Sequence, residues 1–148
     1  MAFTGNAVCV SFKTGLLDGT FDFGTGTSDV FKIALYTNTA TLDSDTAAYT
    51  ATGEVADAGY SAGGSVLTVS QVPTVGSQTG NSSVSYLSFS DVSWSGAITA
   101  RGALIYKYDG ATNPAVCVLD FGSDKTSTAT FQVQFPPATN NSAIIRLG

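Results

Sequence analysis

The chain has 148 residues and a formal net charge of −5; 43% of its residues are hydrophobic and 11% are charged. This balance excludes a disordered chain, which would carry many charges and few aromatic residues. Because the chain contains no histidine, Ser-His-Asp and Cys-His catalytic arrangements are excluded as well. Its six basic residues are scattered singly, whereas binding to nucleic acid needs clustered Lys and Arg, so we expect no nucleic-acid partner.

Residues 1–28 differ from the rest of the chain and are predicted to form an N-terminal helix or arm. Phe12, Leu16 and Leu17 fall at helical spacing, and Gly19 is a suitable residue to end a short helix. The sequence therefore predicts one short helix near the N-terminus.

The end of this segment is open to two interpretations. Phe21 and Phe23 alternate as in a strand or an extended arm, and a Gly/Thr-rich loop over 24–28 follows. The segment either packs on the core of its own chain or extends as an arm that anchors to a neighbouring subunit.

Residues 29–148 consist of short β patterns separated by turn signals. Val30–Tyr36 alternates, with Phe31, Ile33 and Leu35 on one face. Residues 37–64 show no sustained periodicity and are predicted as a long loop, and 73–81 as a second loop. Further β patterns cover 65–69, 84–90, 92–94, 97–101, 102–106, 115–121, 129–135 and 143–147.

Two of these patterns flank a turn cluster at 109–114 and predict a hairpin. Together the elements predict an all-β, single-domain β-sandwich or jelly-roll-like barrel of about eight short antiparallel strands, with at most one short helix. We expect one structural domain, made of the N-terminal segment 1–28 and a β-sandwich over 29–148.

The polar residues form no catalytic pattern. Asp43 and Asp45 are the best carboxylate pair, and we interpret them as turn and capping residues. Trp94 is expected in a core or an interface, with stacking on a sugar as the alternative. Arg101 lies within an apolar run and is expected to pair with a carboxylate or a backbone carbonyl. We therefore expect no catalytic residue, no cofactor and no metal site.

The N-terminus lacks the basic and apolar regions of a secretion signal, and no apolar run approaches the ~20 residues of a membrane helix. We expect a protein made in the cytoplasm that has no membrane partner. In a reducing compartment Cys9 and Cys117 are expected to be buried free thiols.

A series of motifs spread over nearly the whole chain resembles a family of small virion proteins of tailed bacteriophages. The motifs, in order, are Ser11-Phe-Lys13, Leu16-Leu-Asp-Gly19, Asp29-Val-Phe-Lys-Ile-Ala-Leu-Tyr-Thr37, Ala40-Thr-Leu42, Tyr49-Thr50, Gly53-Glu-Val55, Gly59-Tyr-Ser-Ala-Gly-Gly64, Ala100-Arg-Gly-Ala-Leu-Ile-Tyr106, Val118-Leu-Asp-Phe-Gly122 and Thr130-Phe-Gln-Val-Gln-Phe-Pro136.

The resemblance implies a capsid decoration (cement) protein, made in the bacterial host and seated on the outside of the virion head. Its implied partners are the major capsid protein and further copies of itself, as a homotrimer near local three-fold axes. It implies no catalysis. We place the expected subunit or capsid contacts in the N-terminal segment and the long loop, at Phe3, Phe12, Leu16, Leu17, Phe21, Phe23, Tyr49, Val55 and Tyr60.

Two alternatives share the β-rich composition. One is a head-fibre, neck or tail adhesin module of the virion. The other is a free carbohydrate-binding β-module, which predicts an exposed aromatic platform around Trp94, Tyr106 or Tyr108.

Overall fold

The computed structural model describes residues 3–27, 29–77 and 83–148. In this part of the chain ten strands and one helix follow each other in the order β1(Ala7–Val8), α1(Val10–Asp18), β2(Val30–Tyr36), β3(Ser65–Leu67), β4(Val69–Ser77), β5(Ser83–Phe89), β6(Val92–Ser95), β7(Thr99–Tyr108), β8(Ala115–Thr126), β9(Thr130–Val133) and β10(Ile145–Leu147). The prediction of an all-β domain with one short N-terminal helix is confirmed, and ten strands replace the expected eight or so.

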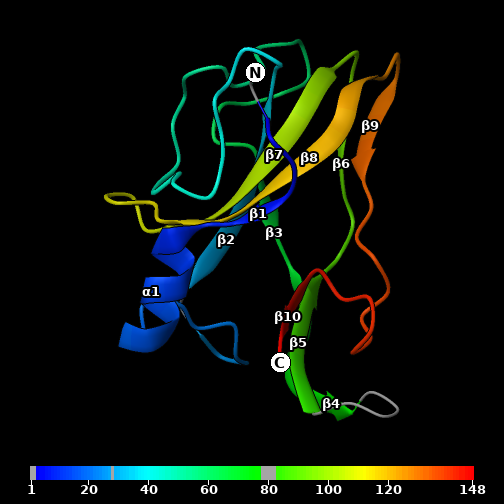
Figure 1. The fold of residues 1–148 in the computed structure, drawn as a ribbon. Coiled ribbons are helices and arrows are strands. Elements are labelled where there is room, and N and C mark those ends of the chain that lie inside the picture. The colour runs from blue at the N-terminus through cyan, green and yellow to red at the C-terminus, as the bar shows by residue number, and fades with distance from the viewer. Residues whose placement is uncertain (1–2, 28, 78–82) are drawn as a thin grey trace.

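The strands form three antiparallel sheets (Figure 1). The large sheet has the order β1-β8-β7-β2-β3, a second sheet has the order β10-β5-β4, and β6 pairs with β9 alone. In Figure 1 α1 and the β10-β5-β4 sheet lie at one end of the molecule, and the long loop 37–64 lies at the other.

The middle of the large sheet, formed by β2, β7 and the first residues of β8, is buried on both faces. Strand β2 shows this best, since Phe31, Ile33 and Leu35 belong to one hydrophobic cluster, while Ala34 and Tyr36 belong to another. The sequence predicted only the first of these faces. Strand β2 thus separates two cores, with β7 at one edge and with β3 and the loop residues Glu54 and Val55 at the other.

Different parts of the chain cover the two faces. The first face is covered by α1, by the β10-β5-β4 sheet and by the β6–β9 pair, which contribute Phe12, Leu87 and Phe131 among others. The second face is covered by the N-terminal residues and the loop 37–64, where Phe3 and Leu42 form an isolated bridge. The long loop therefore acts as a layer of the fold although it has no regular strand.

One long two-stranded ribbon runs from the β6–β9 pair into the β7–β8 pair. The Gly96 amide donates to the Ala129 carbonyl at 2.7 Å, and the Ser127 amide donates to the Ile98 carbonyl at 2.9 Å. The ribbon bends between these two contacts. Its two chain segments therefore form the β6–β9 sheet on one side of the bend and part of the large sheet on the other, as in other β-sandwich corners.

The N-terminal segment packs on the core of its own chain. Helix α1 ends at Gly19, which has a φ of 79° and caps the helix. A Cβ atom on Gly15 would lie 2.3 Å from the Phe21 ring, so the close approach of helix and ring requires a glycine there. Phe21 and Phe23 are buried and form no strand, which corrects the strand alternative for these two residues.

The predicted loop over 73–81 is wrong for residues 73–77, because β4 continues to Ser77. Residues 78–81 of that prediction fall within 78–82, outside the described residues. Pro73 is tolerated because β4 is an edge strand, and its register with β5 shifts between Gln71 and Thr74, where no regular ladder bond is needed.

Candidate interaction surfaces

The nine predicted contact residues fall into three groups by exposure. Five are buried in the cores of the chain itself, namely Phe3, Phe12, Phe21, Phe23 and Val55. Tyr49 and Tyr60 are half-buried, whereas Leu16 and Leu17 are exposed, Leu17 at 92%. The structure therefore narrows the contact prediction, because the five buried side chains offer no surface to another subunit in this conformation.

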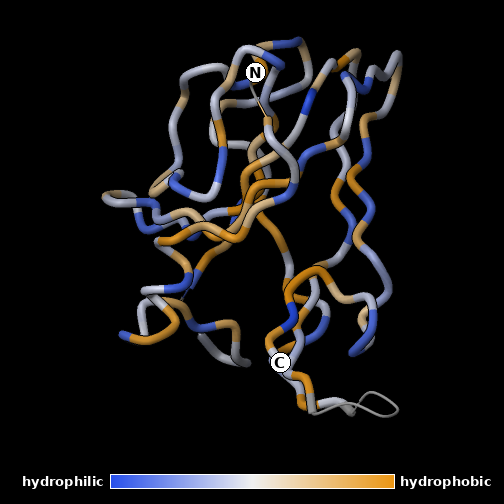
Figure 2. The backbone as a smooth tube through the Cα atoms, viewed as in Figure 1, coloured by the Kyte–Doolittle hydropathy of each residue, from blue (hydrophilic) through white to orange (hydrophobic). Residues whose placement is uncertain are grey.

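Leu16 lines an apolar groove of about 210 Å³ between α1 and the β10-β5-β4 sheet. Phe21 and Phe23 line one wall, and Ile145 and Leu147 line the other. Figure 2 colours several backbone positions of α1 and of the β10-β5-β4 sheet as hydrophobic. The groove and the exposed leucines of α1 form a surface that an apolar partner would cover.

Among the exposed apolar residues that were not predicted, the most exposed are Val66 at 61%, Val75 at 72% and Leu147 at 51%. Alternation reveals the two faces of a strand but not which of them stays uncovered, so the exposure of Val66 and Val75 was not predictable from the sequence. Leu147 lies two positions from buried Ile145, where alternation predicts burial, and it is exposed near the end of β10.

The only glutamate of the chain, Glu54, holds the long loop together. Its carboxylate accepts hydrogen bonds from the hydroxyls of Tyr49 and Tyr60, each at 2.6 Å, and from the amide of Gly63 at 2.7 Å. The Tyr60 hydroxyl also lies 2.9 Å from the amide of Leu35, from which it accepts a hydrogen bond. The group connects the loop to strand β2 and is a structural centre.

Burial raises the pKa of the tyrosines around this centre, and the Glu54 carboxylate adds to the effect. The pKa of Tyr106 rises to about 12, and those of Tyr36 and Tyr60 rise further. These hydroxyls stay protonated in the folded state at pH values at which the unfolded chain has already lost its tyrosine protons.

We expect the protein to lose stability as the pH rises above about 10, the pKa of tyrosine in an unfolded chain. A raised folded-state pKa gives stability that is complete below the unfolded pKa and is lost as the pH rises through the folded value. Urea midpoints measured from neutral to alkaline pH should fall through this range, and Tyr60→Phe should make the fall less steep. A midpoint that stays constant up to about pH 12 would contradict this account.

The cysteines and the aspartate pair considered in the sequence have structural roles, in the core and in a turn. Cys9 and Cys117 are free and buried, and burial raises the pKa of these thiols to about 11 and about 12. The Asp43 carboxylate accepts the amide of Asp45 at 2.9 Å in a turn. Within the described ranges no group of three or more His, Cys, Asp or Glu residues could hold a metal ion.

Trp94 and Arg101 take the positions that the sequence predicted. Trp94 is buried in the first core beside Phe131. Arg101 forms an ion pair with Asp120 and lies over the ring of Phe3, 5.6 Å from its centroid.

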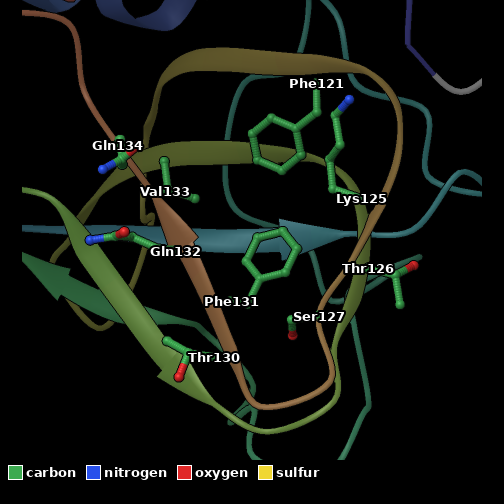
Figure 3. A pocket seen from close by; sticks show the side chains of 9 residues that line it. All are labelled: Phe121, Lys125, Thr126, Ser127, Thr130, Phe131, Gln132, Val133 and Gln134. Carbon is green, nitrogen blue, oxygen red and sulfur yellow. The ribbon is translucent and has the colours of Figure 1, made fainter.

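A second hollow, of about 450 Å³, lies between the end of β8 and strand β9 (Figure 3). The rings of Phe121 and Phe131 face each other there, with centroids 6.2 Å apart. Gln132 and Gln134 project away from these rings in Figure 3, yet all five residues 130–134 line the hollow, as expected where a strand borders a hollow along its edge. The two faces of this strand were predicted correctly from the alternation of its residues, whereas the hollow was not predicted.

Comparisons of the chain with protein-family models, with curated proteins and with solved structures found no match. In the described part of the chain, no helix has the length and apolar character needed to span a bilayer.

Proposed function

We propose that this protein is a structural component of a tailed-bacteriophage virion, seated on the outside of the head as a decoration protein bound to the major capsid protein. The ordered series of motifs in the sequence supports the class. The observation that carries the proposal is the exposed apolar surface of α1, where Leu17 is 92% exposed and the preceding residue, Leu16, lines the groove.

A decoration protein stabilises a shell by burying surface across neighbouring capsid subunits, and it needs no catalytic group. Burying one leucine side chain contributes about 1.5–3 kcal/mol. Leu16, Leu17 and Leu147 therefore provide a useful contribution to such a contact if one partner covers them together.

The alternative of a free carbohydrate-binding module receives less support. Trp94 and Tyr106 are buried, at 6% and 1% exposure. Tyr108 is exposed at 48%, but its ring is already covered in part by Lys32, whose Nζ lies 4.9 Å from the centroid. These three residues thus form no exposed aromatic platform.

Copy number and position in purified virions test the proposal against a neck, fibre or tail module. Quantitative mass spectrometry with labelling of intact particles should find many copies over the head surface. A few copies at one vertex would favour the neck or tail alternative, and absence from virions would refute the proposal.

Leu17→Asp is expected to reduce binding to capsids by about 10-fold or more, since it replaces a buried leucine contact with a desolvated charge. Capsids that lack the protein are titrated with wild type and variant, and bound protein is measured after sedimentation. Val66→Asp, the same change at an exposed apolar position on the outer strand β3, is the control and should bind as wild type. Equal binding of Leu17→Asp and wild type would remove α1 from the contact.

A further inference from the structure

Strand β9 is an edge strand whose outer side has no partner among the described strands. It pairs with β6 on one side through four consecutive residue pairs, from Val92↔Val133 to Ser95↔Thr130, without a register shift. The neighbouring hollow is lined by five consecutive residues, 130–134, which is the pattern of a strand that presents its edge.

The hydrogen-bond phase shows which backbone groups point outward. The Gly96 amide donates to the Ala129 carbonyl, so Ala129 directs its backbone groups towards the β6 side. In an antiparallel ladder every second residue does the same, and the N–H and C=O groups of Phe131 and Val133 therefore point towards β6. The N–H and C=O groups of Thr130 and Gln132 then point away from β6, towards the hollow, and extended geometry directs those of Gln134 the same way.

The other edge strands are short or protected. Strand β4 contains Pro73 and two register shifts, β3 and β10 have three residues each, and β1 has two. Strand β6 is the other edge of the two-stranded sheet, and the long loop lies against it, since a Cβ atom on Gly59 would be 2.0 Å from the Ser95 carbonyl oxygen. Natural edges are blunted by such features or by charged side chains, because an unprotected edge pairs with another strand. Residues 130–134 contain no charge, no proline and no glycine, and β9 has no bulge.

We propose that β9 pairs with β9 of a second copy of this chain, antiparallel about a two-fold axis at Gln132. The segment Thr130-Phe-Gln-Val-Gln134 has the same polar–apolar pattern in both directions. Pairing about Gln132 places Gln132 opposite Gln132 and Thr130 opposite Gln134, and these are the residues whose backbone groups point outward.

Neutral side chains favour a second copy over a charged partner strand. An edge residue on a two-fold axis lies opposite itself, and like charges directly opposite each other destabilise a strand pair. Gln132 avoids this repulsion. The contact joins two two-stranded sheets into one of four strands, and it does not rest on the proposed function.

Charge exchange at position 132 tests the pairing. Light scattering over a concentration series should give wild type a mass approaching twice 15.1 kDa. Gln132→Lys and Gln132→Glu should each shift the equilibrium towards monomer by about 10-fold or more, and an equimolar mixture of the two should restore the dimer. Ser93→Lys, opposite Gln132 on β6 and therefore one strand away from the proposed contact, is the matched control and should dimerise as wild type.

A second pair of variants tests the backbone. Gln132→Pro removes the outward N–H and should weaken the dimer, whereas Gln132→Ala keeps the N–H and should leave it intact. Circular dichroism confirms that each variant is folded. A wild type that stays monomeric throughout the series, a trimer, or a dimer that none of the Gln132 changes affects would overturn the proposal.

Discussion

Replacing Phe23 with alanine is expected to lower the free energy of unfolding by about 3–5 kcal/mol, the usual cost of removing a buried phenylalanine. Phe23 stacks on Phe31 of strand β2 with ring centroids 4.2 Å apart, and it also contacts Phe89 edge-on at 6.2 Å. It is 4% exposed although it lies in the N-terminal segment. Urea unfolding followed by tryptophan fluorescence and circular dichroism measures the loss.

Leu17→Ala is the matched control, because Leu17 lies in the same segment but is 92% exposed. Its stability should stay within about 0.5 kcal/mol of wild type. The comparison separates the two interpretations of this segment. A detachable arm would make Phe23→Ala as mild as Leu17→Ala, and that result would contradict the packing described here.

Replacing Glu54 with alanine is expected to cost about 2–4 kcal/mol, since it leaves several donors without their acceptor. The hydroxyls of Tyr49 and Tyr60 and the amide of Gly63 all bond to its carboxylate. Glu54→Gln keeps an acceptor oxygen and the shape of the side chain, so it should cost less than the alanine variant.

Asp45→Ala serves as the control for Glu54, because Asp45 is an exposed carboxylate in the same loop. Chemical denaturation should find it close to wild type. Hydrogen exchange should show faster exchange over 49–64 in Glu54→Ala and no change in Asp45→Ala. If Glu54→Ala and Asp45→Ala are equally stable, the carboxylate is not the structural centre of the loop.

Much of the fold could be predicted because local patterns determine it. Strand β9 is buried on one face and wet on the other, so Phe131 and Val133 alternate visibly with Gln132 and Gln134. Helix α1 was predictable from its apolar spacing and from Gly19, which provides the left-handed cap. Alternation and capping are local signals, and they were sufficient here.

The second core could not be predicted in the same way. Lys32 and Ala34 on β2 resemble a wet face in the sequence, yet Ala34 is fully buried and Lys32 is half-buried. The loop that covers them has no periodicity, since its position depends on tertiary hydrogen bonds such as those of Glu54. The candidate surfaces were predictable only in part. Leu16 and Leu17 were identified, but the exposure of Leu147 and the open edge of β9 depend on which elements pack nearby.

The position of β2 has a consequence for the making of the protein. Strand β2 pairs with β3 through Phe31↔Leu67 and with β7 from Val30↔Tyr108 to Tyr36↔Gly102. A ribosome must therefore deliver more than sixty further residues before this doubly apolar strand gains its second neighbour. Pairing over such sequence distances folds slowly, on a scale of about milliseconds to seconds. The nascent chain consequently exposes this apolar strand while those residues are added, and it is most vulnerable to aggregation at that stage.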